Sequence, residues 1–350
     1  MQGSLKFGGC TIEAGTRKTV QLPLPYSYTH APTTMPVHVV RGRKEGPSLL
    51  ITSAVHGDEI NGVEIIRRIL GHASLSRLRG TLILIPVVNV FGFVGQSRYL
   101  PDRRDLNRSF PGSSRGSMAA RLANLLMAEV LPHCSHVIDL HTGAVGRKNL
   151  PQIRATFDGQ NELLRELALS FATPVVLDAA LREGTFRQAA HQMGIPTLVY
   201  EAGEALRFDE VSIRAGVTGI LNVMGRLNMI RKRTRNRAHT PTIAKGSSWV
   251  RAPQSGVVRS LVALGAHVSP GDILAYIGDP FGGSEEPTVA AVAGIIIGRA
   301  RLPLVHEGEA IFHIARFVQA SEAAESVEQF QDEFDPVTGT SDSDEPPVVG

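Results

Sequence analysis

A short apolar run that ends in a histidine and a glutamate constrains this chain more than any other stretch. Residues 49–55, Leu-Leu-Ile-Thr-Ser-Ala-Val, have the length and β-branched content of a strand, and the apolar spacing of residues 63–70 is helical. His56 and Glu59 lie between the two segments. The pattern therefore predicts an imidazole and a carboxylate at the carboxyl edge of a sheet, where α/β proteins usually keep their active sites.

His56 and Glu59 are candidate metal ligands. Zinc binds imidazole nitrogen and carboxylate oxygen, and a catalytic zinc takes three protein ligands and leaves one position open. A third ligand must therefore come from elsewhere in the chain. The same His-x-x-Glu spacing recurs at His306 and Glu309, but nothing nearby supports a metal site, and we interpret that pair as turn residues between strands.

A second strand pattern, residues 135–140, ends in another histidine, His141. A histidine at such a place is more often a core or surface residue, but as a partner for His56 and Glu59 it is the obvious third ligand. Asp139 lies two residues earlier, so it would point to the same side of the strand and could orient the site.

A further strand pattern, residues 197–200, ends in an acid, Glu201. We take Glu201 as the candidate general base, because it is the first charged side chain after the strand, and Glu204 as the second choice. The alternative is a solvated acid that opens a loop. With the strands at residues 49–55 and 81–90, these patterns predict parallel strands connected by helices in an α/β sheet.

The loop at residues 98–112 carries four arginines, which is more than a turn-rich loop needs for folding. A guanidinium meets a carboxylate in a two-pronged geometry that lysine cannot copy. We therefore expect a loop that binds a substrate carboxylate, and the alternative is a solvated basic loop.

The composition is that of a globular chain. With 350 residues, of which 43% are hydrophobic and 20% charged, it can build more than one domain. No apolar run approaches the roughly 20 residues that span a bilayer, and the first residues lack the layout of a signal peptide. We expect a cytoplasmic protein with no membrane partner, whose two cysteines are reduced thiols.

The net charge of +3 hides an asymmetry between the two ends of the chain. Residues 319–350 contain nine acidic side chains and no Lys or Arg, which leaves about +12 on the remainder. We expect residues 318–350 to be a disordered acidic tail. Residues 231–246 are interpreted as a basic linker and not as a nucleic-acid surface, because no aromatic side chain is interleaved with the arginines.

Residues 247–317 show short strand patterns and glycine turns that repeat with a period of about 37 residues. The pattern resembles the small β-sandwich of the biotinyl and lipoyl type, which usually carries its cofactor on a lysine. Lys245 is the last lysine of the chain, so no residue in this segment can carry such a cofactor. We expect a structural or gating domain packed beside the catalytic one.

Four motifs in a fixed order link the chain to a known family. They are His56-Gly57-Asp58-Glu59, Asp105-Leu106-Asn107-Arg108, Asp139-Leu140-His141-Thr142-Gly143 and Glu201-Ala202-Gly203. Together they resemble the succinylglutamate desuccinylase and aspartoacylase family over roughly residues 35–230. The resemblance implies the fold of the zinc carboxypeptidases for residues 1–230, an α/β domain with a mixed sheet and flanking helices.

The same resemblance implies roles for the predicted site residues. His56, Glu59 and His141 would hold one Zn²⁺, which polarises a carbonyl and lowers the pKa of water. Glu201 would act as the general base and return the proton to the leaving amine. The implied reaction is hydrolysis of an amide.

Residues of the arginine loop complete the implied site. Arg98 would polarise the scissile carbonyl, and Asn107 with Arg108 would grip a substrate carboxylate. The loop is about two residues longer than in aspartoacylase and adds Arg103 and Arg104, which favours substrates with a second acidic group.

Three classes of function fit these residues. The first is a zinc amide hydrolase that removes the acyl group of an N-acyl amino acid, and the second is a zinc carboxypeptidase acting on short or γ-glutamyl peptides. The third is a binding protein that keeps the fold without the chemistry, which the presence of ligands, base and arginines together weakens. The expected partner is a small molecule or short peptide with a free carboxylate, and a homo-oligomer is left open.

Overall fold

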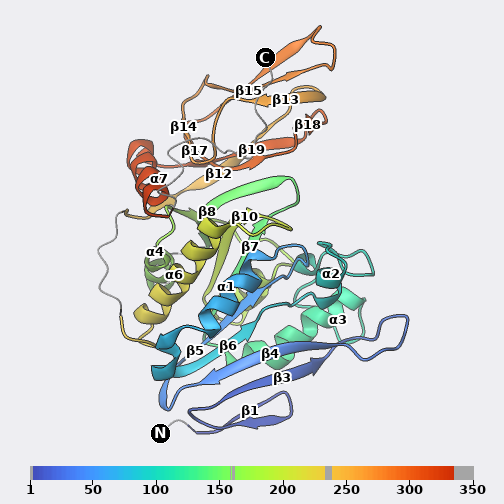
Figure 1. Ribbon diagram of the computed structural model, residues 1–350, viewed down its shortest axis with the longest axis vertical. Coiled ribbons are helices and arrows are strands. Elements are labelled where there is room, and N and C mark those ends of the chain that lie inside the picture. The colour runs from blue at the N-terminus through green and yellow to red at the C-terminus, as the bar shows by residue number, and fades with distance from the viewer. Residues whose placement is uncertain (1–2, 158, 160–161, 233–238, 335–350) are drawn as a thin grey trace.

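A large mixed sheet runs through the molecule, and helices cover both of its faces (Figure 1). The computed structural model describes residues 3–157, 159, 162–232 and 239–334. The strands follow one another across the sheet in the order β12 (Gly246–Arg251), β19 (Ala310–Arg316), β17 (Gly294–Ala300), β8 (Arg147–Ala155), β10 (Thr197–Glu204), β7 (His136–Gly143), β5 (Lys44–Ser53), β6 (Arg79–Ile85), β4 (Thr34–Arg41) and β3 (Arg17–Pro23). Short strands join it from the side, namely β9 (Val175–Asp178), β11 (Thr242–Ala244) and β14 (His267–Val268).

The strands that carry the predicted site are parallel neighbours. β5 pairs in parallel with β6 and β7, and β7 pairs in parallel with β10. Their carboxyl ends therefore meet at one edge of the sheet. The expected mixed sheet is confirmed, because β4 runs antiparallel to β6, and β8 runs antiparallel to β10 and β17.

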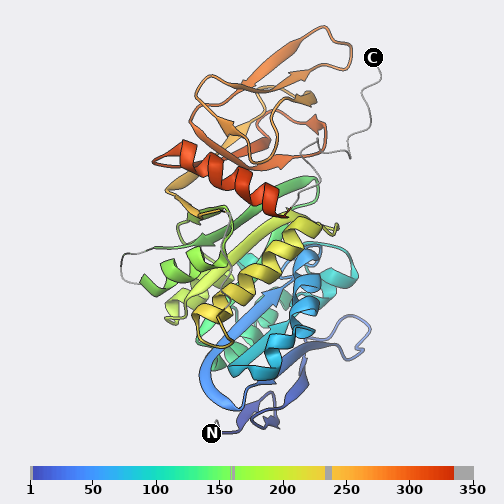
Figure 2. The same cartoon turned by 60° about the vertical axis from the view of Figure 1, so that its left-hand side comes forward.

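Alternation of side chains along the strands explains why both faces are covered. Leu49 and Ile51 of β5 belong to one core and Leu50 to the other, and β6 divides its apolar residues in the same way. One face carries helices that lie side by side in Figures 1 and 2, namely α1 (Asn61–Leu70), α4 (Glu162–Phe171) and α6 (Glu210–Arg226). The other face carries α2 (Val90–Val94), α3 (Met118–Leu125) and α5 (Phe186–Gln192).

Shorter elements complete the amino-terminal part. The hairpin of β1 (Leu5–Phe7) and β2 (Cys10–Ile12) packs Phe7 and Ile12 into the second core. Single helical turns connect the longer elements, namely the 3-10 turns η1 (Ala73–Arg77), η2 (Leu106–Arg108) and η4 (Leu131–His133) and the π-helical turn η3 (Leu126–Val130). The turn η2 belongs to the arginine loop, so that loop has local structure of its own.

The C-terminal β domain is a two-sheet sandwich whose inner sheet belongs to the large sheet. Its outer sheet has the order β16 (Glu285–Val289), β15 (Ile273–Gly278), β13 (Gly256–Ser260) and β18 (Leu304–Val305), with apolar side chains filling the space between the sheets. β17 pairs antiparallel with β8 at residues 298–300. The domain is therefore hydrogen-bonded into the sheet and not only packed beside it, because the edge of β8 offers backbone groups that need partners.

Residues 231–246, expected to be a basic linker, are in part a strand of the large sheet, which corrects that expectation. β11 pairs in parallel with β9, from Thr242 opposite Val175 to Ala244 opposite Leu177. A strand this short gives no period that a sequence pattern can reveal. Residues 231–232 are exposed, and residues 233–238 of the basic cluster lie outside the described residues.

The acidic tail expected at residues 318–350 is helical over much of its length, so the expectation of disorder was wrong there. α7 (Ala320–Phe334) places apolar side chains at helical spacing on one buried face, namely Ala323, Val327, Phe330 and Phe334. The acidic composition hid this stripe, because an average over the segment loses the period. Residues 335–350 lie outside the described part of the chain.

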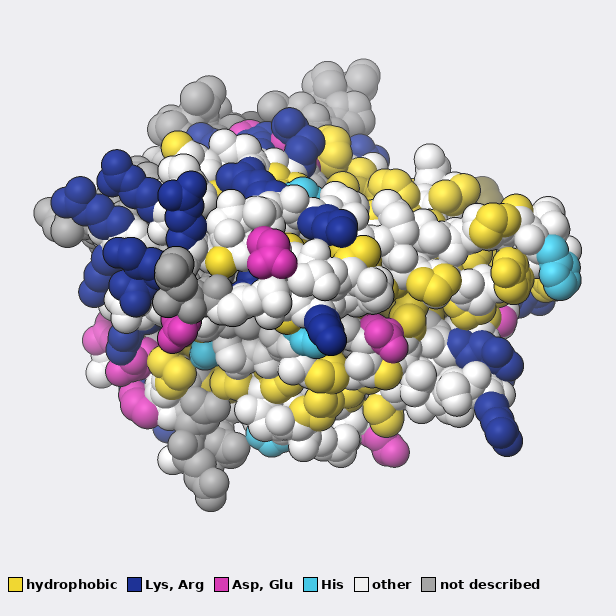
Figure 3. Space-filling view, turned by 90° about the horizontal axis from the view of Figure 1, so that it is seen from below, with side chains coloured by type: hydrophobic (Ala, Val, Ile, Leu, Met, Phe, Trp, Pro, Cys, Tyr) yellow, Lys and Arg dark blue, Asp and Glu magenta, His cyan; other side chains and the backbone are white. Residues whose placement is uncertain are grey.

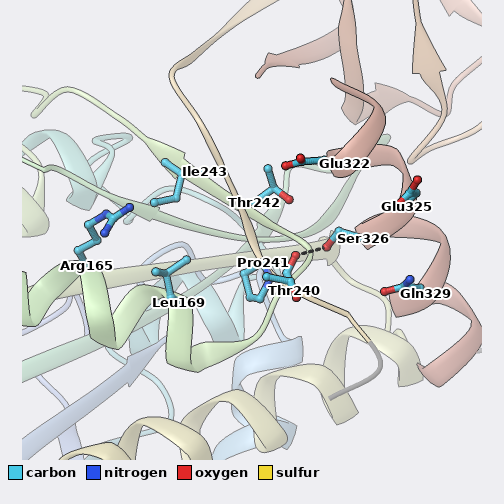
Figure 4. Close-up of a pocket in the computed structure, with 10 residues that line it drawn as sticks. All are labelled: Arg165, Leu169, Thr240, Pro241, Thr242, Ile243, Glu322, Glu325, Ser326 and Gln329. Carbon is cyan, nitrogen blue, oxygen red and sulfur yellow. Dashed lines mark hydrogen bonds between the residues drawn. The ribbon is translucent and has the colours of Figure 1, made fainter. Parts of the chain in front are cut away.

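α7 folds back over the junction of β11 and α4 (Figure 4). Ser326 of α7 donates a hydrogen bond to the carbonyl oxygen of Thr240 at 2.7 Å, and a pocket of about 480 Å³ lies beside this contact. Phe330 is 1% exposed and stacks on Phe334 with ring centroids 4.7 Å apart. α7 therefore packs against both the C-terminal β domain and the amino-terminal domain and connects them.

Figure 3 shows Lys and Arg side chains crowded toward one side of the face seen from below. Arg43 and Lys44 lie at the start of β5 and Arg79 at the start of β6, and all three are exposed.

Within the part of the chain that the structure describes, no helix has both the length and the hydropathy to cross a membrane.

Replacing Phe330 by alanine should lower the free energy of unfolding by about 3–5 kcal/mol, because the change removes a fully buried ring from under α7. The matched control is Glu328→Ala, an exposed position on the same helix, which should change stability by less than about 0.5 kcal/mol. Denaturant titration of the variants and the wild type measures both values. Equal stability of Phe330→Ala and wild type would show that α7 does not hold the domains together.

Candidate active site

Strand β5 delivers His56 and Glu59 to the carboxyl edge of the sheet. The chain leaves β5 through Ala54, whose φ of 48° is left-handed, and the amide of Glu59 then donates to the carbonyl of His56 at 3.1 Å. Glycine is required at position 57, because a Cβ on Gly57 would lie 2.0 Å from the backbone of Gly92. This tight turn brings both side chains to the same side before α1 begins.

The carboxylate of Glu59 joins two histidines. Its Oε1 lies 2.7 Å from Nδ1 of His56, and its Oε2 lies 2.8 Å from Nδ1 of His141. The backbone amide of Thr142 also donates to Oε2 at 3.1 Å. His56, Glu59 and His141 are at most 5% exposed, and one ligand atom from each lies within 4.8 Å of the others. The structure thus brings together the three predicted metal ligands.

The outward nitrogen of each imidazole contacts a carboxylate. Nε2 of His141 lies 2.8 Å from Oδ2 of Asp139, and Nε2 of His56 lies 3.1 Å from Oδ1 of Asp105. Asp139 also accepts a hydrogen bond from the hydroxyl of Thr52 at 2.7 Å. Carboxylates in these places fix the ring orientation and leave both Nδ1 atoms facing Glu59.

The charges of this cluster stabilise one another. Burial alone would raise the pKa of the Glu59 carboxyl, but the neighbouring imidazoles of His56 and His141 bring that pKa well below its usual range. Burial would lower the pKa of His141, but Asp139 and Glu59 hold it well above the ordinary histidine value. Two imidazole nitrogens and this carboxylate form a group that could hold a metal ion.

The second His-x-x-Glu pair has the placement expected from the sequence. The amide of Glu309 donates to the carbonyl of His306 at 3.0 Å, and the amide of His306 donates to Oε2 of Glu309 at 3.1 Å. Both residues form the turn between β18 and β19. Their interpretation as turn residues is confirmed.

Of the two candidate bases, Glu201 lines the pocket that contains the cluster. It lies beside His141 in the pairing of β10 with β7. Its Oε2 accepts a hydrogen bond from Nδ2 of Asn149 at 2.9 Å, and its Oε1 lies 3.3 Å from Nη1 of Arg154. Glu204 is turned elsewhere, since its carboxylate accepts the amide of Gly146 at 2.9 Å and does not line this pocket.

Arg98 lies in the pocket between two acids. Its Nε and Nη2 donate to Oδ2 of Asp105 at 3.2 and 2.9 Å, and its Nη1 lies 3.4 Å from Oε1 of Glu59. The charges of His56 and Arg98 outweigh burial and keep the pKa of Asp105 well below its usual range. Asp105 therefore links the arginine loop to the group of His56, Glu59 and His141. The position of Asp105 in the sequence does not predict this contact.

The rest of the arginine loop divides between the pocket and the surface. Asn107 and Arg108 both line the pocket. The side chain of Asn107 also accepts a hydrogen bond from the backbone amide of Phe186 at 2.9 Å and so anchors the start of α5. Arg103 and Arg104 are exposed and do not line it. These two arginines therefore give no support for a second acidic group on the substrate.

Other arginines supply positive charge to the pocket, which has a volume of about 240 Å³. Arg154 comes from β8, Arg182 from the segment before α5, and Arg187 from α5 itself. Burial and then the charge of Arg154 lower the pKa of Arg187 to about 10. Sequence reasoning missed all three, because each stands alone in a strand, loop or helix without a local motif.

Sequence comparison links this site to known enzymes. Residues 45–227, more than half of the 350, match the succinylglutamate desuccinylase/aspartoacylase catalytic domain. The chain is 27% identical over 301 residues to the N-alpha-acetyl-L-2,4-diaminobutyric acid deacetylase of Halomonas elongata, with 82% of this chain and 86% of the relative covered.

Solved structures share the architecture of both domains. The succinylglutamate desuccinylase/aspartoacylase from Rhodobacter sphaeroides is 25% identical with a TM-score of 0.78, over 88% of this chain and 98% of its own. The product-bound ectoine utilization protein EutE (DoeB) from Ruegeria pomeroyi is 24% identical with a TM-score of 0.79, and the match covers 86% of this chain and 95% of that protein. With its catalytic-domain match and its ordered motifs, the chain belongs to the succinylglutamate desuccinylase/aspartoacylase family.

Proposed function

We propose that this protein is a zinc-dependent amide hydrolase that removes the acyl group from an N-acyl amino acid. One observation carries the proposal: a single pocket contains the His56, Glu59 and His141 group, which could hold a metal ion, together with the carboxylate of Glu201. The name of the Halomonas elongata relative, a deacetylase of an N-acetylated amino acid, supports an amide as the bond that is broken.

The donor set fits zinc. Two imidazole nitrogens and one carboxylate oxygen are a common ligand set of catalytic zinc sites. Asp105 and Asp139 contact the outward imidazole nitrogens, as acids do around such ligands. When bound, zinc would polarise the amide carbonyl and lower the pKa of water to about 7.

The chain's own residues would move the proton and hold the carbonyl. Glu201 would take a proton from the attacking water and return it to the leaving nitrogen. Arg98 would offer its guanidinium to the carbonyl oxygen as negative charge develops there. Its contacts with Asp105 and Glu59 fix its direction before the substrate binds. The products would be a carboxylic acid and a free amino acid.

The charges of the pocket favour an acidic substrate. The acids that line it are already paired, Glu59 and Asp139 with histidines and Glu201 with Arg154. The pocket is also lined by Arg98 and Arg154, which contact Asp105 and Glu201, and by three further arginines, Arg108, Arg182 and Arg187. A substrate with one carboxylate for Arg108 and a second acidic group would fit better than one with an extra ammonium group.

Removal of a ligand should remove the metal. The purified protein should hold about one zinc per chain, and His56→Ala or His141→Ala should lose most of it. His306→Ala is the matched control, because it has the same spacing to its glutamate but lies in a turn, and it should keep its zinc. Elemental analysis by mass spectrometry measures the content. Full zinc content in both site variants would rule out this ligand set.

Removal of the base should separate binding from chemistry. Glu201→Gln keeps the shape of the side chain and removes the proton acceptor, so it should retain the metal and lose turnover by about 10² to 10⁴-fold. Glu204 does not line the pocket, so the turnover of Glu204→Gln should stay near that of wild type. Steady-state kinetics on N-acyl amino acids decides between them. If Glu201→Gln turns over as fast as wild type, another group is the general base.

Removal of the substrate carboxylate should abolish the contribution of Arg108. In wild type, kcat/KM should be about ten- to a hundredfold higher for a free acid than for its carboxamide, since a charged hydrogen bond is lost. Arg108→Ala should remove that preference, and Arg108→Lys should not restore it. Arg103→Ala, an exposed change in the same loop, is the control. Equal cleavage of acid and carboxamide by wild type would show that Arg108 does not bind the substrate.

A further inference from the structure

We propose that Asn149 is a positioning residue for Glu201 and that the C-terminal β domain holds Asn149 in place through β17. The inference rests on the proposed function, in which Glu201 is the general base, and adds what directs its carboxylate. Asn149 contacts Glu201 but does not line the pocket, so it can act on the substrate only through Glu201.

The carboxylate of Glu201 is held at both oxygens by β8. Nδ2 of Asn149 donates to Oε2 at 2.9 Å, while Nη1 of Arg154 lies 3.3 Å from Oε1. The two contacts differ in kind. Arg154 stabilises the negative charge, whereas the neutral amide of Asn149 fixes the direction of the carboxylate without adding charge. A base must point at the proton that it takes, so direction is as important here as charge.

The backbone of Asn149 is paired on both sides. It lies opposite Gly203 of β10 on one side and opposite Gly298 of β17 on the other. The register of β10 shifts between Glu201 and Gly203, and the pairing of β17 with β19 shifts between Ile296 and Gly298. Such irregularities re-aim side chains near a sheet edge. Here they let the buried side chain of Asn149 reach the carboxylate of Glu201.

Gly298 leaves the space that the Asn149 amide occupies. A Cβ at Gly298 would lie 2.9 Å from Oδ1 of Asn149 and 3.4 Å from Cβ of His313. The first contact is too close, but it involves the end of a side chain, which can rotate away. The second is an ordinary contact. A methyl group at this position should therefore displace the amide of Asn149 and leave the strands paired.

The C-terminal β domain also fixes the start of β8. The guanidinium of Arg147 lies 4.7 Å from the ring centroid of Trp249, and its Nη2 donates to the carbonyl of Ala310 at 3.0 Å. The amide of Arg301 donates to the carbonyl of Gly146 at 2.8 Å. These contacts hold the connection between β7 and β8, two strands that flank β10 and carry His141 and Asn149 respectively.

Kinetics of two variants test the proposal. Asn149→Leu should lower kcat by about ten- to a hundredfold, the effect of losing a hydrogen bond to a charged group, and leave KM within about threefold. Gly298→Ala should lower kcat by a similar factor although residue 149 is still asparagine, because the added methyl group displaces its amide. Gly283→Ala, in the exposed turn between β15 and β16, is the control from the same domain and should match wild type. A loss confined to KM in both variants would overturn the proposal.

A double-mutant cycle shows whether Asn149 acts through Glu201. In a Glu201→Gln background, Asn149→Leu should cost less than about a further threefold in kcat, because the group that it directs is already gone. A loss as large as that in wild type would mean that Asn149 supports the fold or the substrate instead, and the proposal would fall.

Crystal structures of the same variants give a readout that does not depend on activity. In Asn149→Leu and Gly298→Ala the Glu201 carboxylate should leave its present place while β8 stays paired with β10 and β17. A carboxylate that stays in place in both variants would disprove positioning, even in an active enzyme. A displaced carboxylate in a protein that cleaves no amide would support positioning and refute the proposed function.

Discussion

The carboxylate of Glu59 lies buried between His56, which follows β5, and His141, which lies on β7. Its burial requires the polar contacts that surround it. A buried charge is tolerated only when it is paired and hydrogen-bonded. The two imidazoles and the amide of Thr142 satisfy Glu59. Each imidazole in turn contacts Asp105 or Asp139, and Asp139 accepts the hydroxyl of Thr52. The network therefore extends outward from one carboxylate. Its contacts between Glu59 and His141 and between Thr52 and Asp139 join the β5 side to β7, whose strands pair in parallel.

The C-terminal β domain is part of the same framework. A domain that carries a tethered cofactor must swing between sites, and it needs a lysine to hold the cofactor. This one has no lysine, its strand β17 is hydrogen-bonded to β8, and α7 packs it against the amino-terminal domain. Of the two roles expected from the sequence, structural or gating, those contacts favour the structural one, a fixed support for the connection between β7 and β8.

The candidate metal group could be predicted from the sequence because each of its residues belongs to a local pattern. His56, Glu59 and His141 all follow or end apolar strands, and parallel strands bring their carboxyl ends together. Arg187 and Asn149 could not be found in this way, since each is a single polar residue in an ordinary helix or strand whose partner is distant in sequence. The same limit explains the wrong prediction of disorder at α7. The segment is acidic on average, and its apolar stripe indicates a buried helix only once the residues that cover the stripe are known.

The charge of the pocket bears on which substrate this chain accepts. Among the described residues, Nη1 of Arg187 is buried without a hydrogen-bond partner, and burial with the nearby charge of Arg154 lowers the pKa of Arg187 to about 10. A buried guanidinium in that state is stabilised by an anion and destabilised by a second cation. The relative's name specifies a diaminobutyric acid, which brings an extra amino group. An ammonium group in this pocket would meet arginines, and the acids there are already engaged. The charge of this pocket therefore supports the proposal that the substrate is an N-acylated acidic amino acid.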